Sequence, residues 1–214
     1  MIGQIQLKVC GLTTPADAAV AAESGADYLG FVLHEKSPRR ITLARFGEML
    51  AELPDRPKVA VLVEPGPGTL ASLRQAGFDR LQVHFRHETP QATLESWSLE
   101  AGGGRLWLAP KLPPAADVPP AWLSFCSHVL LDTFDPVLFG GTGRAGDWAK
   151  FRRHASAHPA HGWILSGGLN PGNIGTAIRE SGARFVDVNS GVESAPGVKD
   201  HGKVRAFAEA LASA

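Results

Sequence analysis

The chain of 214 residues is long enough to bury a sizeable core and short enough to predict one domain spanning residues 1–214. Acidic and basic side chains balance at 21 each without blocks of one sign, which argues against nucleic-acid and membrane partners. Two cysteines cannot form a disulfide framework, no apolar run approaches the ~20 residues of a membrane-spanning helix, and the start is too polar for a signal peptide. These features predict a soluble, cytoplasmic protein.

Eight short apolar runs recur along the chain, each followed by turn residues and then by a helical pattern. Buried parallel strands have near-continuous apolar runs, because both faces of a parallel sheet are covered. The predicted strands are IQLKVC (5–10), DYLGFVL (27–33), KVAVLV (58–63), RLQVHF (80–85), RLWLAP (105–110), HVLLD (128–132), GWILSG (162–167) and RFVDVN (184–189).

Capping signals mark the helices between these runs. Thr14 followed by Pro15 predicts one helix start, Thr42 predicts another, and Asn170 is the expected N-cap of a later helix. After the fifth strand, the four prolines of residues 113–127 permit only a short or irregular helix. The remaining helical segments are predicted over 63–78, 87–103, 147–158, 170–182 and 201–214.

Eight strand–helix units of about 25 residues each favour a compact α/β fold, the (β/α)8 TIM barrel. An open, doubly wound parallel sheet is the alternative. In a barrel, functional side chains gather where strands end and the following loops begin. Residues that precede strands lie at the opposite, structural end.

Two reactive side chains come directly after predicted strands. Cys10 ends the first strand, where a thiol is either a small buried hydrophobe or, beside a cation or a helix N-terminus, an available thiolate. Asp132 ends the sixth strand, where burial would raise the pKa of its carboxyl group and suit it to general-acid work. A loop-starting aspartate that caps amides is the alternative. Cys126 precedes a strand, so we assign it to packing.

Other charged residues have weaker signals. Arg39 lies in the loop after the second strand, where its guanidinium either is solvated or holds a substrate carboxylate. Lys8 faces the same side of its strand as Cys10 and is a candidate charge partner for a carboxylate such as Asp187. We expect no metal site from the three histidines that precede the seventh strand, His154, His158 and His161.

Glycine-rich segments follow the last three strands, over residues 139–148, 165–174 and 186–194. Amides of such loops bind anions, and the loops after strands seven and eight of a barrel often bind phosphate. We therefore expect a phosphorylated small-molecule substrate.

Taken together, these segments resemble the phosphoribosylanthranilate isomerase family, (β/α)8 enzymes of tryptophan biosynthesis. The resemblance spans nearly the whole chain and follows the family's order. The motifs are KVCGLT at the first strand, GADYLGFVLHEKSPRRI at the second, LQVH at the fourth, LLDT and GGTGRAGDW at the sixth, LSGGLNPGNI at the seventh, and VDVNSGVESAPGVKDHGKV at the eighth.

The resemblance implies one catalytic domain, monomeric or homodimeric, that carries out an Amadori rearrangement of N-(5-phosphoribosyl)anthranilate. This aldose–ketose isomerisation opens the ribose ring and moves its carbonyl group. Cys10 is the implied general base, Asp132 the general acid, and Arg39 the holder of the anthranilate carboxylate. No metal, nicotinamide or flavin cofactor is expected, because the substrate nitrogen is its own electron sink. The further implied substrate-binding residues, chiefly for the phosphate, are Gly141, Gly167, Gly168, Asp187, Ser190 and Gly191.

Two positions depart from the family pattern, since Phe85 stands where glycine is common and Asn189 where serine is usual. One alternative is a related barrel isomerase of histidine biosynthesis, which would be expected to have an aspartate in place of Cys10. The other is a non-catalytic binder of phosphorylated metabolites. The isomerase mechanism requires Cys10 and Asp132 to face one cavity.

Overall fold

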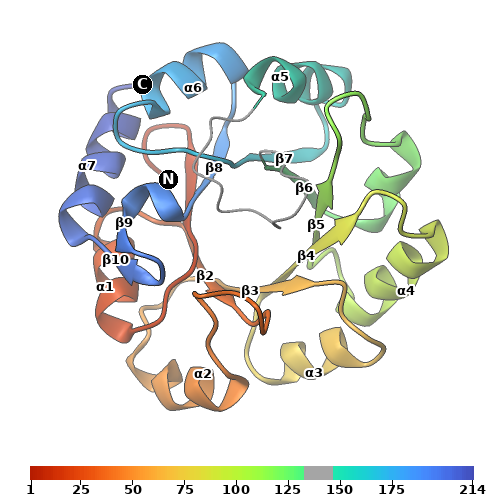
Figure 1. Cartoon of the computed structure of the whole chain (residues 1–214), viewed down its shortest axis with the longest axis horizontal. Coiled ribbons are helices and arrows are strands. Elements are labelled where there is room, and N and C mark those ends of the chain that lie inside the picture. Colours follow the sequence, from red (N-terminus) through yellow and green to blue (C-terminus); the bar gives the residue numbers. More distant parts are fainter. Residues whose placement is uncertain (133–146) are drawn as a thin grey trace.

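The computed structural model describes residues 1–132 and 147–214 of the chain (Figure 1). Eight parallel strands form a closed barrel in which β1 pairs with β8. This closure confirms the predicted (β/α)8 barrel and excludes the open sheet. The strands are β1 Gln6–Val9, β2 Tyr28–Val32, β3 Lys58–Val63, β4 Arg80–Arg86, β5 Leu106–Lys111, β6 His128–Leu131, β7 Gly162–Leu165 and β8 Phe185–Val188.

Helices surround the barrel on its outside (Figure 1). A short antiparallel pair follows β8, formed by β9 (Glu193–Ala195) and β10 (Val198–Lys199). The α-helices are α1 Pro15–Glu23, α2 Leu43–Met49, α3 Thr69–Gln75, α4 Gln91–Ala101, α5 Trp148–Ala157, α6 Ile174–Ser181 and α7 His201–Ala212, and the 3₁₀ helices are η1 Leu50–Glu52, η2 Pro120–Phe125 and η3 Ser190–Val192.

Two predicted helix starts are confirmed, and one is wrong. The Thr14 hydroxyl accepts a hydrogen bond from the Asp17 amide at 3.2 Å, so Thr14 caps α1 as expected. Thr42 caps α2 in the same way. Asn170 does not cap α6, because its side chain accepts from the Gly172 amide and closes a local turn. The helix begins only after this turn, at Ile174.

The fifth helix has the predicted irregular form. Residues 120–125 form the 3₁₀ helix η2, which begins at Pro120 directly after Pro119. Proline is tolerated at a helix start, where its missing amide hydrogen costs nothing, but it blocks a longer α-helix.

Alternation along the strands produces two separate apolar layers. One side of each strand packs against the surrounding helices, and the other fills the barrel interior. At the amino-terminal end of the barrel, an aromatic cluster of Tyr28, Trp107, His128 and Phe185 fills the interior, with neighbouring ring centroids 5.0 to 5.7 Å apart. The interior is thus filled at this end and polar at the other. Among the helices of the described segments, none has the length and apolar character that crossing a bilayer requires.

Candidate active site

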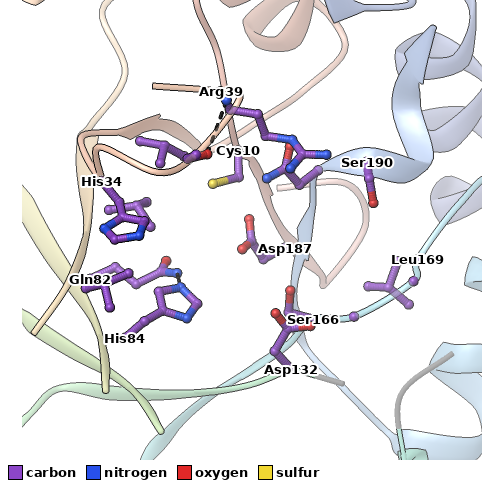
Figure 2. Close-up of a pocket in the computed structure, with 17 residues that line it drawn as sticks. Cys10, His34, Arg39, Gln82, His84, Asp132, Ser166, Leu169, Asp187 and Ser190 are labelled. Carbon is purple, nitrogen blue, oxygen red and sulfur yellow. Dashed lines mark hydrogen bonds between the residues drawn. The ribbon is translucent and has the colours of Figure 1, made fainter. Parts of the chain in front are cut away.

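A cavity opens at the carboxyl-terminal ends of the barrel strands (Figure 2). Its walls come from the ends of β1, β2, β3, β4, β6, β7 and β8 and from the loops that follow them. The lining residues are Cys10, Val32, His34, Ser37, Arg39, Val61, Val63, Gln82, His84, Asp132, Ser166, Gly167, Gly168, Leu169, Asp187, Asn189 and Ser190.

The predicted site residues gather at this cavity from distant parts of the chain. Gly191 does not line the cavity but lies beside it, and Gly141 lies outside the described residues. The predicted residues that line the cavity are Cys10, Arg39, Asp132, Gly167, Gly168, Asp187 and Ser190.

Cys10 lies directly after β1, where its amide donates to the carbonyl of Val188 at 2.9 Å. The residue is only 3% exposed, and its thiol is not in a disulfide. Burial raises the pKa of this thiol, and the positive charge of Lys8 opposes the rise. Gly30 lies against it on β2, since a Cβ there would stand 3.0 Å from the Cys10 sulfur. The thiol therefore occupies a tight space with one face toward the cavity.

Lys8 and Asp187 form a buried ion pair beneath Cys10. The Lys8 ammonium donates to Asp187 Oδ1 at 2.9 Å, and the two side chains are 0% and 6% exposed. This confirms the candidate pairing of Lys8 with Asp187. Burial favours the neutral amine, but Asp187 and then Cys10 hold the pKa of Lys8 above its ordinary value.

Arg39 has a carboxylate partner within the protein. Its Nε and Nη2 donate to the two carboxylate oxygens of Glu193 at 2.9 and 2.8 Å. Lys199 donates to the same carboxylate at 2.9 Å. Although burial acts the other way, Arg39 and Lys199 hold the pKa of Glu193 below its ordinary value. Nη1 of Arg39 has no partner among the described residues, so the guanidinium is held at one edge and available at the other.

The loops after β7 and β8 touch each other at glycines. Gly167 and Gly168 have φ angles of 94° and 63°, in the region that glycine adopts most easily. The Gly168 carbonyl accepts from Asn173 Nδ2, while no described residue accepts from the amides of Gly167 or Gly168. A Cβ on Gly191 would stand 1.9 Å from the carbonyl oxygen of Leu169. This close approach requires glycine at position 191. The amides of Gly167 and Gly168 are available to bind an anion.

Gln82 and His84 are site residues to which the sequence assigns no role. They lie two positions apart on β4, so both side chains face the cavity. The Gln82 side-chain nitrogen lies 2.8 Å from His84 Nε2. Burial, followed by the charge of Lys8, lowers the pKa of His84 to about 3, so this imidazole is neutral near pH 7. The signal in the sequence that could have identified them is their spacing of two residues in a predicted strand, which places both side chains on one face.

Both departures from the family pattern have a structural explanation. Phe85 is fully buried and points away from the cavity, where it packs edge-on against Trp97 and Trp122 with centroids 5.8 and 5.4 Å away. Its size therefore does not narrow the cavity. The Asn189 side-chain oxygen accepts from Lys199 Nζ at 2.9 Å, a bond that joins the loop after β8 to β10.

The residues assigned to the structural end lie there. Cys126 precedes β6, and its sulfur lies 3.7 Å from His161 Nε2. His154 lies in α5 and stacks on Trp163, with centroids 5.5 Å apart. Within the described ranges, no group of three His, Cys, Asp or Glu side chains is arranged to hold a metal ion.

Comparisons with known proteins agree on one family. Residues 7–210 match the model of N-(5'phosphoribosyl)anthranilate (PRA) isomerase. An N-(5'-phosphoribosyl)anthranilate isomerase from Paramagnetospirillum magneticum is 40% identical over 213 residues, covering 96% of each chain. The crystal structure of phosphoribosyl anthranilate isomerase from Thermus thermophilus is similar with a TM-score of 0.80 at 29% identity, covering 98% of this chain and 99% of that one.

Another solved structure adds a ligand. It is phosphoribosyl anthranilate isomerase in complex with reduced 1-(o-carboxyphenylamino)-1-deoxyribulose 5-phosphate, similar with a TM-score of 0.75 at 28% identity, covering 98% of this chain and 100% of that one. The family model and these relatives confirm the resemblance inferred from the motifs. The chain belongs to the N-(5'-phosphoribosyl)anthranilate isomerase family, and its activity is the aldose–ketose isomerisation of tryptophan biosynthesis.

Proposed function

We propose that Asp132 is the general acid and Cys10 the general base with which the chain converts N-(5-phospho-β-D-ribosyl)anthranilate to 1-(2-carboxyphenylamino)-1-deoxy-D-ribulose 5-phosphate. The observation that carries this proposal is that both side chains line one cavity, although they come from the ends of two non-adjacent strands, β1 and β6 (Figure 2). A proton donor and a proton acceptor on different walls can act on different atoms of one bound sugar.

The first step opens the ribose ring. Asp132 donates its proton to the ring oxygen as the bond from that oxygen to C1' breaks, and the anthranilate nitrogen supplies the electron pair that forms a C1'–nitrogen double bond. The product is an open-chain iminium cation with a new hydroxyl group on C4'. Asp132 lines the cavity at the end of β6 and is half-buried, which suits a carboxyl group that must carry a proton.

The second step moves a proton from C2' to the Cys10 sulfur. The electrons of the C2'–H bond form a C1'–C2' double bond, and the π electrons of the C1'–nitrogen double bond return to nitrogen, which leaves a C1'–nitrogen single bond. The resulting enolamine tautomerises to the ketone by losing the proton of its 2'-hydroxyl group and gaining one at C1'. The iminium cation acidifies C2', so a thiolate of modest basicity suffices. The substrate nitrogen accepts the electrons, and the chemistry needs no further electron sink.

Binding of the substrate follows the charges around the cavity. The phosphate would lie against the amides after β7 and β8, near Gly167, Gly168, Ser190 and Gly191. The anthranilate carboxylate would bind the free edge of the Arg39 guanidinium. Gly141 keeps its predicted role as a further substrate contact.

Asp187 would accept a hydrogen bond from a ribose hydroxyl group through the carboxylate oxygen that does not bind Lys8. All these roles fall on one chain, so the proposal holds for a monomer or a homodimer. It describes one catalytic domain of residues 1–214, working in the cytoplasm on a phosphorylated small molecule.

The decisive experiment follows the fluorescence of phosphoribosylanthranilate with purified protein and no added metal. Asp132→Asn keeps the shape of the side chain but cannot donate an acidic proton, and Cys10→Ser replaces the base by a hydroxyl. We expect each substitution to lower kcat by about 10²- to 10⁴-fold, the usual contribution of one positioned acid or base.

Each variant is first compared with the unmodified protein by circular dichroism and thermal unfolding. A folded Asp132→Asn protein with near-normal turnover would rule out Asp132 as the acid. The same result for Cys10→Ser would rule out the thiol as the base.

A further inference from the structure

A buried thiol is a poor base unless something stabilises its anion. Burial raises the pKa of Cys10, and a protonated thiol cannot accept the C2' proton. The groups around the sulfur must therefore make the thiolate accessible. The geometry on β1 and β8 shows which groups are close enough.

Lys8 shares with Cys10 the space left open by a glycine. The two residues are two positions apart on one strand, so their side chains lie on the same inner face. A Cβ on Gly30 would stand 2.9 Å from Lys8 Cε and 3.0 Å from the Cys10 sulfur, so both groups pack against the same position on β2. The absence of a side chain at Gly30 allows the lysine stem and the sulfur to lie together.

Asp187 holds the lysine head on its other side. The Lys8 nitrogen lies 2.9 Å from Asp187 Oδ1, and Asp187 also lines the cavity that Cys10 faces (Figure 2). A fully buried ammonium needs a nearby anion to keep its proton. Asp187 is one such anion and the Cys10 thiolate is another, since both raise the pKa of Lys8. The thiol thus lies beside a cation that lowers its pKa and near an anion that raises it.

Other titratable groups face the same space. Lys199 of β10 is a second buried cation whose charge acts on Cys10. The remaining groups that line the cavity are His34 and Arg39 after β2, His84 of β4 and Asp132 after β6. Lys8 differs from all of these because it lies on β1, two positions before Cys10, with its partner Asp187 on the adjacent strand β8.

We propose that Lys8 and Asp187 are positioning residues that set the basicity of Cys10. The Lys8 ammonium stabilises the thiolate, and the Asp187 carboxylate, which binds the same ammonium, limits its effect on the sulfur. When the C2' proton reaches the thiolate, the ion pair remains and keeps the charge of the barrel interior balanced. This inference rests on the proposed role of Cys10 as the base.

The test measures the pKa of the Cys10 thiol in the free protein, without substrate. A Cys126→Ser background leaves one cysteine, and the pH dependence of iodoacetamide alkylation and of the ultraviolet absorbance of the thiolate gives its pKa. Lys8→Met should raise this pKa by about one unit or more, so that alkylation near pH 7 slows about tenfold. Asp187→Asn should lower it, because the thiolate then remains as the anion that keeps Lys8 charged. The double substitution should give a value between those of the two single variants and above that of the unmodified protein.

Opposite shifts from the two members of one ion pair separate tuning from a structural role, which would move both variants in the same direction or neither. Lys8→Met leaves a buried carboxylate unpaired and can prevent folding. The double variant removes both charges, and Lys8→Arg retains the cation, so at least one informative protein remains. Lys8→Arg should keep the thiol pKa closer to that of the unmodified protein than Lys8→Met does.

Two results would overturn the inference: a thiol pKa unchanged in the double variant, or a rise in Asp187→Asn. Failure of the proposed function gives a different pattern. In that case Cys10→Ser keeps its turnover whatever the thiol pKa does. If only this inference fails, Cys10→Ser is inactive and the thiol pKa stays unchanged when the charges of Lys8 and Asp187 are removed. In Lys8→Met, the acidic limb of the pH dependence of kcat should shift in the same direction as the thiol pKa.

Discussion

The two cysteines lie at opposite ends of the barrel and have opposite surroundings. Cys10 faces the cavity, and burial raises its pKa while Lys8 and Lys199 oppose that rise. Cys126, at the amino-terminal end, has a pKa raised by burial to about 12, and backbone hydrogen bonds with Leu108 and His128 oppose the rise. Burial alone therefore makes a thiol inert, and the charges at the carboxyl-terminal end are what distinguish Cys10.

The same contrast holds for the whole barrel interior. The amino-terminal end is filled by four packed rings, whereas the carboxyl-terminal end carries an ion pair, a cation–carboxylate cluster and glycine-rich loops. One end supports the fold and the other holds the proposed catalytic residues, which agrees with the usual location of active sites in barrels of this type. Paired substitutions at the two ends test how strict this division is.

The largest difference is expected between the two cysteines. Cys10→Ser should lower kcat by about 10²- to 10⁴-fold, while Cys126→Ser should leave kcat and KM roughly unchanged, because its sulfur lies at the far end of the barrel. Steady-state kinetics on both variants checks this. Comparable losses in both would show that the two ends are not functionally separate.

Two glycines provide the next comparison. A Cβ on Gly191 would meet the Leu169 carbonyl oxygen at 1.9 Å, and one on Gly162 would meet the His128 ring at 2.3 Å. Each alanine substitution should destabilise the protein, by about 1–3 kcal/mol, because something must move to admit the methyl group.

Only Gly191→Ala should also raise KM, since it displaces the loops proposed to bind phosphate. Urea unfolding gives the stability of both variants, and initial rates give KM. An unchanged KM in a folded Gly191→Ala protein would show that these loops do not contribute to substrate binding.

Glu193→Gln tests how Arg39 is held. The substitution weakens the two-pronged hydrogen bond to Arg39 and leaves Lys199 without its carboxylate. With the guanidinium less fixed, KM should rise by about tenfold and kcat should change less. Asp117→Asn, which weakens an ion pair with Arg153 and a contact with His154 outside the cavity, is the matched control and should leave KM unchanged. A kcat loss as large as that of Cys10→Ser would mean that Glu193 acts in the chemical step.

The last comparison is a pH dependence of stability that involves a histidine from each end. Burial, followed by the charge of Lys8, lowers the pKa of His84 to about 3, and burial, followed by His161, lowers that of His128 to about 4. The unfolded chain binds these protons near pH 6.5, so between about pH 6.5 and pH 4 it holds more protons than the folded chain. The free energy of unfolding should therefore fall as the pH falls through this window.

Each histidine contributes at most about 1.4 kcal/mol per pH unit, and less where its ring contacts water. Urea unfolding between about pH 7 and pH 4.5 measures the slope, which His84→Gln and His128→Gln should each reduce. If neither variant changes the slope, these two imidazoles are not the source of the acid sensitivity.

Much of the fold could be predicted because its signals are local. The apolar runs of the strands, the caps at Thr14 and Thr42 and the proline-rich stretch before η2 each depend on a few neighbouring residues. The start of α6 could not, because an asparagine can either cap a helix or close a local turn, and the Asn170 side chain accepts from the Gly172 amide and closes a turn.

The site was predictable only in part. Position after a strand identified Cys10 and Asp132, because every barrel strand ends at the same face. It did not identify Gln82 and His84, which lie within β4, nor Glu193, whose importance depends on its contact with Arg39.

The sequence by itself determined the alternation of strands and helices and the family to which the chain belongs. Strand position made Asp187 one candidate partner of Lys8, but only the tertiary structure decided which charges meet. Lys8 reaches Asp187 across 179 positions of sequence, and Arg39 reaches Glu193 across 154. The physical reason is that barrel closure places β1 beside β8, and no local pattern specifies which of many buried charges will then face one another.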